Sequence, residues 1–233
     1  MEFEVGLYAH PIFSSKGGWP ERVERRVAKK SSDQGFLWSR LPKFSVEEIE
    51  MLKGSSDFYG FNHYSTRFYT RKDMRGCNFI VPSYEDDLGA KGSYLEDVYK
   101  FDTGASPHCT VIPEGIRAAL NWVKKSYNNP PVLITENGFG TFGDKDEVRV
   151  SYYRRYMHNV LNAIEKDNCN VQCYTAWSLM DNFEWDSGLS IKFGLFEVDF
   201  NDENRPRKPR GSADWYRHTV STKTLDPKYK PVI

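Results

Sequence analysis

Three short apolar segments that alternate with helical segments constrain the fold of this 233-residue chain more than any other feature. Strands are predicted at residues 57–62, 132–135 and 171–178, because each is rich in β-branched or aromatic residues and bounded by turn formers. Pro113 opens a helix between the first two strands, and residues 151–167 show the clearest helical periodicity of the chain. This order is typical of a parallel sheet with crossover helices, whose functional groups gather at the carboxyl ends of the strands.

Several weaker signals complete the expected element order. Residues 5–30 are predicted to be helical in two pieces, broken at 17–20, and Ser45 with Glu48 forms a capping box for a short helix. Another short helix is expected at 213–218, and residues 71–107 are expected to be irregular. The aromatic content of the first strand, 57–62, favours burial on both of its faces.

The second strand carries an acid to its end. Glu136 follows an apolar run and precedes Asn137-Gly138, which predicts a turn that presents the carboxylate. A lone strand-end glutamate is usually just solvated, but a second segment, 176–186, also ends an apolar strand and offers two tryptophans and three acidic residues. Flat aromatic faces and carboxylate acceptors suit a sugar, whose ring faces are apolar and whose edges carry hydroxyls.

The composition excludes several classes of partner. Lysine plus arginine and aspartate plus glutamate both total 32, so the charge balance favours neither nucleic acid nor an anionic membrane. The basic cluster at 205–210 is interpreted as a solvated loop. No apolar run approaches the roughly 20 residues that span a bilayer, and the first residues lack the pattern of a secretion signal.

Cysteine and histidine spacing indicates no metal site. The four cysteines, Cys77, Cys109, Cys169 and Cys173, show neither a CxxC pair nor a ligand-like spacing with histidine. Cys169 and Cys173 are predicted to be buried thiols, and a disulfide involving Cys77 and Cys109 stays open. No cofactor is expected.

Three strand-end motifs lie at residues 61–64 (FNHY), 135–138 (TENG) and 177–185. Together with ordered motifs along the rest of the chain, they closely resemble glycoside hydrolase family 1, the retaining β-glucosidases, whose fold is an eight-stranded (β/α)8 TIM barrel. Residues 3–12 resemble the helix after the family's fifth strand, and 53–64 its sixth strand. Residues 134–138 (ITENG) resemble the seventh strand with its nucleophile, and 177–185 the eighth strand with its sugar-binding loop. Two further matches, at 193–195 and 212–216, complete the resemblance.

The resemblance implies roles at the carboxyl ends of the sixth and seventh strands. Glu136 is implied as the nucleophile that attacks the anomeric carbon and forms a glycosyl-enzyme. Tyr64 resembles the tyrosine whose hydroxyl bonds that nucleophile. Asn62 resembles an amide near the same carboxylate, although a strand-end turn residue is a fair alternative.

Four further residues are implied to bind the sugar. Trp177 would be the platform under the ring, Glu184 would accept from the 4- and 6-hydroxyls, and Trp185 would donate its indole N–H to a neighbouring hydroxyl. Phe193 would line the region near the 6-position, with a plain core phenylalanine as the alternative. Such polar groups discriminate among epimers, because a wrong epimer leaves them unpaired.

One part of the family pattern is missing. Retaining hydrolysis needs two carboxyl groups about 5–5.5 Å apart, and the family takes its acid from an Asn-Glu-Pro motif that occurs nowhere in this chain. Glu114 is interpreted as a helix-opening acid instead of a replacement. The sequence therefore predicts a partial barrel, strands six to eight with their helices, in which residues 1–233 are the C-terminal half of the catalytic domain.

Two classes of function follow from this expectation. The first is a fragment of a secreted or cytosolic β-glucosidase that acts on terminal β-linked glucosides, with Glu136 but without its acid partner. The second is a non-catalytic sugar-binding remnant that keeps Trp177, Glu184 and Trp185. A half-barrel that assembles with a second copy or with a separate N-terminal half is a third and weaker interpretation.

Overall fold

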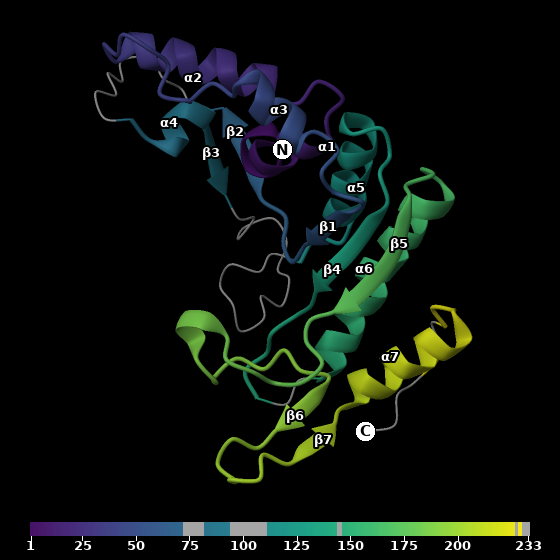
Figure 1. The fold of residues 1–233 in the computed structure, drawn as a ribbon. Coiled ribbons are helices and arrows are strands. Elements are labelled where there is room, and N and C mark those ends of the chain that lie inside the picture. Colours follow the sequence, from purple (N-terminus) through teal and green to yellow (C-terminus); the bar gives the residue numbers. More distant parts are fainter. Residues whose placement is uncertain (72–81, 94–110, 144–145, 227, 230–233) are drawn as a thin grey trace. The chain divides into compact units, whose positions relative to one another are not determined.

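The computed structural model describes residues 1–71, 82–93, 111–143, 146–226 and 228–229 (Figure 1). The chain is α/β and divides into two compact units, which are described separately. The first unit contains Met1–Tyr59, Arg67–Tyr94 and Trp122–Pro131, and the second contains Gly60–Thr66, Leu95–Asn121 and Val132–Ile233.

The first unit is mainly helical. Its predicted helical region is interrupted as expected, because Gly17 and Gly18 adopt φ values of +69° and +65°, which glycine tolerates best. Ser45 and Glu48 form the predicted capping box, with bonds of 3.1 and 2.7 Å. The elements of this unit are η1 (Glu2–Gly6), α1 (Leu7–Phe13), α2 (Glu21–Asp33), α3 (Val46–Leu52), α4 (Tyr84–Leu88) and the antiparallel strands β2 (Phe68–Arg71) and β3 (Ala90–Ser93).

The expectation that residues 71–107 are irregular was wrong where the structure describes them, since α4 and β3 lie there. Ser83 accepts a bond from the Asp86 backbone N–H and caps α4, while Gly89 ends the helix at φ +60°. Two acidic residues of α4 are paired, since Lys30 donates to Asp86 at 2.6 Å and Arg40 to Asp87 at 2.5 Å. Residues 72–81 and 94–110, including Cys77 and Cys109, lie outside the described residues.

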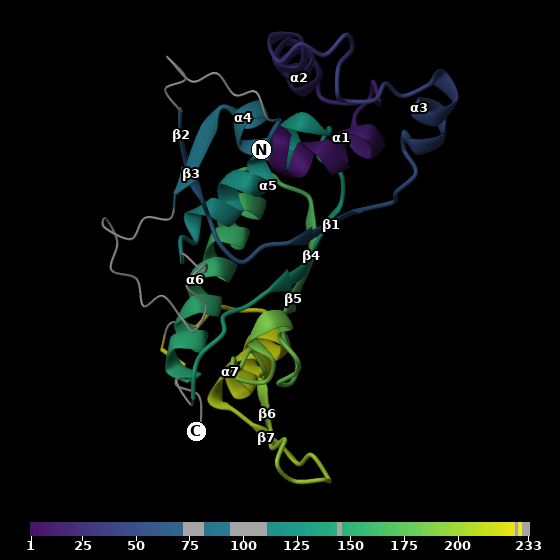
Figure 2. The same cartoon turned by 90° about the vertical axis from the view of Figure 1, so that its left-hand side faces the viewer.

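The second unit contains the expected sheet. The strand order is β1 (Tyr59–Asn62), β4 (Val132–Asn137), β5 (Val171–Ala176), and β4 pairs with β5 in parallel, as predicted. The long helix α6 (Asp146–Glu165) runs beside β4 and β5 in both views (Figures 1 and 2). The helix α5 (Glu114–Ser126) begins in the second unit and ends in the first. The other elements of the second unit are η2 (Trp185–Ser187), the antiparallel strands β6 (Phe196–Val198) and β7 (Arg207–Pro209), and α7 (Gly211–Thr222).

The apolar stripe predicted for α5 is confirmed, because Ile116, Leu120 and Val123 are all at most 1% exposed. α7 begins earlier and ends later than expected. Asp146 accounts for its start, because its carboxylate accepts the backbone N–H and the hydroxyl of Ser212. An acidic group in that place also complements the positive end of the helix dipole.

The outer strands of the sheet are only partly buried. β1 was expected to be buried on both faces, but Tyr59 and Phe61 are buried while Gly60 and Asn62 are exposed. In β5, Cys173 is likewise exposed, so the prediction of a buried thiol is confirmed for Cys169 and wrong for Cys173. Both strands lie at the ends of the strand order, so their open edges and faces depart from the two-sided burial of complete parallel sheets.

Candidate functional site

Glu136 and Tyr64 form a direct hydrogen bond at the carboxyl ends of β4 and β1. Glu136 is the fifth residue of β4, and Tyr64 follows β1 by two positions. The Tyr64 hydroxyl donates to Glu136 Oε2 at 2.5 Å. Burial, and next the bond to Glu136, raises the pKa of Tyr64 well above its ordinary value. Tyr64 is therefore a neutral donor throughout the physiological range, and the carboxylate has a fixed partner.

Asn137 is a structural residue that the sequence interpretation missed. It was expected to make a turn with Gly138, but it is the last residue of β4 and is fully buried. Its Nδ2 donates to the His63 carbonyl at 2.7 Å and to the Tyr152 hydroxyl at 2.9 Å, and its Oδ1 accepts from Tyr174. Asparagine satisfies all these groups because its amide offers two donors and an acceptor.

Gly138 allows two strand ends to approach each other. A Cβ at this position would lie 1.8 Å from the backbone oxygen of Trp177 and 2.8 Å from its carbonyl carbon. The backbone N–H of Trp177 donates to the Asn137 carbonyl at 2.8 Å, so the contact lies immediately beside the last bond of this strand pair. The glycine is needed for this close approach. A glycine that follows a buried strand was the available sequence signal, and it had been attributed to a turn.

Trp177 and Glu184 form a second bonded pair next to the first. The Trp177 indole N–H, just past β5, donates to Glu184 Oε1 at 3.1 Å. Glu184 is 9% exposed, and its pKa is raised, chiefly because burial disfavours its charged form. Bonds from Trp177 and Asn182 oppose this rise, and the negative charge of Glu136 adds to it. The charge of Glu136 is therefore close enough to affect Glu184, which lies in the loop after β5.

An apolar cluster supports both pairs. Ile191 and Phe193 are buried, and Tyr64 and Trp177 pack against them. The rings of Phe193 and Tyr64 meet edge to face, with centroids 6.2 Å apart and an interplanar angle of 89°. The structure therefore brings together four of the seven residues singled out from the sequence, Glu136, Tyr64, Trp177 and Glu184, with Phe193 as their apolar support.

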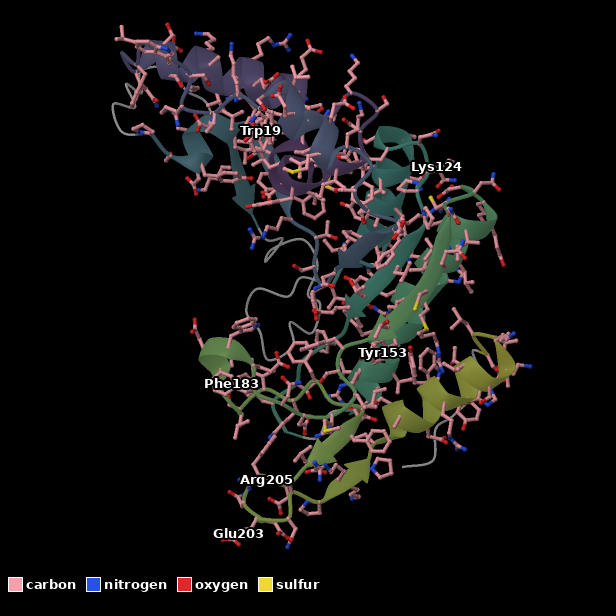
Figure 3. The ribbon with its side chains drawn as sticks, viewed as in Figure 1. Trp19, Lys124, Tyr153, Phe183, Glu203 and Arg205 are labelled. Carbon is pink, nitrogen blue, oxygen red and sulfur yellow. The ribbon has the colours of Figure 1, made fainter. Side chains whose placement is uncertain are left out.

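Asn62 and Trp185 are exposed and do not belong to the cluster formed by the other five predicted site residues. Asn62 is exposed and accepts a 2.5 Å bond from the hydroxyl of Thr135, the residue before Glu136. Trp185 is 85% exposed and begins the turn η2. Phe183, labelled in Figure 3, lies in the same loop. Its exposed fraction is 71%. This loop therefore presents aromatic surface to solvent beside the Glu184 carboxylate.

A buried ion pair holds that loop and was also missed. Asp181 accepts from both terminal nitrogens of Arg210, at 3.0 and 2.8 Å, and from the backbone N–H of Gly194 at 2.9 Å. The interpretation of 205–210 as a solvated loop was therefore wrong for Arg210, whose side chain is 7% exposed. Residues 207–209 form β7, which is exposed throughout. The bidentate geometry fixes the course of the chain between β5 and β6.

No group of three or more potential metal ligands occurs among the described residues. None of the helices in the described part of the chain is both long and apolar enough to cross a membrane.

The family is decided by comparison with known sequences. Residues 1–225 match the sequence profile of Glycosyl hydrolase family 1. The chain belongs to glycosyl hydrolase family 1. Within this family it is 42% identical over 224 residues to Myrosinase 1 of Brevicoryne brassicae. This alignment covers 95% of this chain and 46% of the myrosinase. The chain is 38% identical over 230 residues to the cytosolic beta-glucosidase of Cavia porcellus, with 97% and 47% covered.

Solved structures of the family agree in fold. The aphid myrosinase superposes with a TM-score of 0.83 at 42% identity, over 97% of this chain and 47% of that one. The rice Os3BGlu6 beta-glucosidase gives a TM-score of 0.81 at 32% identity, over 93% and 45%. These neighbours are TIM-barrel glycosidases, and the open sheets of this family 1 chain match part of such a barrel. The chain spans about half the length of the relatives that it matches.

Proposed function

We propose that residues 1–233 are the C-terminal half of a family 1 catalytic domain, with β1, β4 and β5 as strands six, seven and eight of a (β/α)8 barrel. The parallel β4–β5 pair, the crossover helix α6 and the half-length coverage of the relatives support this assignment. The exposed residues of β1 and β5 are then positions that the remaining strands and the filled barrel interior would cover.

The complete domain would hydrolyse terminal β-linked glucosides with retention of configuration. Glu136 would attack the anomeric carbon as the aglycone leaves, and water would then release the sugar from the resulting ester. The hydrogen bond from Tyr64 to Glu136 carries this proposal, because it orients a strand-end carboxylate without neutralising it. When the Glu136 carboxylate becomes esterified to the sugar, the Tyr64 hydroxyl would remain beside its oxygen atoms.

The general acid would come from outside these 233 residues. A retaining site needs a second carboxyl about 5–5.5 Å from the nucleophile, and the Asn-Glu-Pro motif that supplies it in the family is absent from this sequence. Glu184 is a poor substitute, because its Oε1 accepts the Trp177 indole N–H. We assign Glu184 to sugar binding, since a carboxylate has several acceptor sites and can accept from sugar hydroxyls as well as from Trp177.

The glucose unit would lie on Trp177, with Phe193 beside it. Glu184 would accept from two sugar hydroxyls and Trp185, whose indole is exposed, would donate to one of them. Asn62, held by Thr135, would contribute its amide from the end of β1. Aromatic stacking combined with fixed acceptors is the usual chemistry of sugar recognition.

Covalent labelling tests the assignment of the nucleophile. The protein, expressed with any upstream coding sequence that its transcript carries, is incubated with a 2-fluoro glucoside that has a dinitrophenyl leaving group, which needs no proton donor. We expect one sugar on the peptide that contains Glu136, and none in Glu136→Gln. Label on another carboxylate would refute the assignment.

The same experiment separates the alternative function. The intact Trp177–Glu184 pair, in a chain that lacks the second carboxyl, is the observation that favours a non-catalytic sugar-binding protein. Saturable binding of glucose without labelling would support that alternative. Full turnover of unactivated glycosides by these 233 residues alone would show that the acid is not missing.

A further inference from the structure

Two tyrosine hydroxyls of α6 converge on a single backbone carbonyl, that of Tyr64. Tyr152 donates to it at 3.0 Å and Tyr156 at 3.2 Å. The two rings lie four residues apart on one face of the helix and stack with centroids 4.2 Å apart. Both tyrosines are at most 2% exposed. Phenylalanine would fill the same space without the cost of burying a hydroxyl, so the two hydroxyl groups contribute through hydrogen bonds, among them those to the Tyr64 carbonyl.

Asn137 connects this carbonyl to the strand that carries Glu136. Its Nδ2 donates to the Tyr152 hydroxyl at 2.9 Å and to the carbonyl of His63, the residue before Tyr64, at 2.7 Å. The contacts therefore form a closed ring. Starting at Glu136, the ring passes along the backbone to Asn137, through the Tyr152 hydroxyl to the Tyr64 carbonyl, and through the Tyr64 side chain back to the Glu136 carboxylate.

Tyr64 needs such support because it lies beyond the regular part of β1. The backbone N–H of His63 donates to the Glu136 carbonyl at 3.0 Å, so the chain is still joined to β4 one residue earlier. After His63, the backbone carbonyl of Tyr64 is held by hydrogen bonds from the hydroxyls of Tyr152 and Tyr156 on α6. The direction of the Tyr64 side chain follows from the placement of this part of the backbone.

We propose that Tyr152 is a positioning residue, which together with Asn137 and Tyr156 holds the Tyr64 hydroxyl against Glu136. This inference rests on the proposed function of Glu136 as nucleophile. Tyr152 is the focus of the inference, because its hydroxyl both accepts from Asn137 and donates to the Tyr64 carbonyl, to which Tyr156 donates a second bond.

The test compares three substitutions that each remove one hydroxyl. Tyr152→Phe and Tyr156→Phe act on the ring, and Tyr216→Phe is the matched control, because its hydroxyl donates to a backbone carbonyl of β5 at 3.0 Å. The measured quantity is the rate of covalent labelling by the fluorinated dinitrophenyl glucoside. A 1 Å misplacement can cost about 100-fold, so we expect about tenfold slower labelling in Tyr152→Phe and a smaller change in Tyr156→Phe. Tyr216→Phe should label at the wild-type rate.

A double-mutant cycle distinguishes positioning from general destabilisation. The backbone carbonyl of residue 64 remains in Tyr64→Phe, so a purely structural role of Tyr152 would persist in that background. We expect Tyr152→Phe to slow labelling in the wild type and to have no further effect in Tyr64→Phe. Equal effects in both backgrounds, or no effect in the wild type, would overturn the inference.

A second measurement keeps the inference separate from the proposed function. If the wild-type protein is never labelled, the proposed function fails, and the chemical shift of the Tyr64 ring carbon that bears the hydroxyl decides the inference instead. That signal should move in Tyr152→Phe as the bond to Glu136 lengthens, and should stay in place in Tyr216→Phe. An unchanged signal in Tyr152→Phe would overturn the inference independently of any activity.

Discussion

His63 should make the second unit sensitive to mild acid. Its ring packs between Phe61 and Tyr156, with centroids 5.5 and 5.8 Å away, and its buried Nδ1 has no hydrogen-bond partner among the described residues. Burial lowers the pKa of His63 from 6.5 to about 4. The folded protein therefore holds a neutral imidazole at pH values where the unfolded chain already binds a proton.

The size of the effect follows from the two pKa values. Because the folded value is depressed, the stability that the neutral imidazole provides is fully present above pH 6.5 and is lost as the pH falls toward 4. With these values, the free energy of unfolding should fall by about 2 kcal/mol between pH 7 and pH 5 on account of this residue. Such a loss is a large fraction of the roughly 5–15 kcal/mol typical of a folded domain.

Urea unfolding at pH 7 and pH 5 measures this difference. The wild-type protein should lose about 2 kcal/mol more than His63→Phe, which keeps a ring in the same space and cannot be protonated. His158→Phe, at an exposed position of α6, is the control for the substitution itself and should retain the wild-type dependence. If the wild type and His63→Phe showed equal losses, the argument that burial keeps His63 neutral would be refuted.

Three further substitutions test other contacts of the structure. Gly138→Ala places a methyl group against the Trp177 backbone and should lower the free energy of unfolding by about 1–3 kcal/mol or more in urea; a neutral result would mean that the strand ends can separate freely. Asp181→Ala leaves the Arg210 charge buried without its carboxylate and should cost about 3–5 kcal/mol, and a loss below about 1 kcal/mol by thermal or urea unfolding would contradict a buried pair. Ser45→Ala removes the cap of α3 and should cost about 1 kcal/mol in the first unit, measured by hydrogen exchange of the first turn, where unchanged protection would count against the cap.

The elements predicted well from the sequence are those with a strong local signal. β4 and α5 have clear apolar patterns, and the capping box of α3 is a purely local motif. The paired strands β2 and β7 were missed because their residues are all exposed, so no alternation of apolar and polar residues marks them. Their pairing depends on partners that are not adjacent in sequence.

The site was predicted where family motifs coincide with strand ends. The structure places Tyr64 against Glu136 and Trp177 against Glu184, although the catalytic and binding roles of these residues stay predictions. Asn137 was misjudged because an asparagine before a glycine is typical of turns, and its burial depends on groups that only the folded chain brings to it.

The absence of a side chain at Gly138 limits how the geometry of the site could change among related proteins. The distance between the ends of β4 and β5 is set by direct contact between two backbone segments, at Gly138 and Trp177. No side chain lies between them whose size could change this distance. Residues around Glu136 and Trp177 can therefore vary in size and polarity while the span between these two remains fixed. Substrate selectivity would then change through the side chains that line the site, while the distance between the ends of β4 and β5 stays the same.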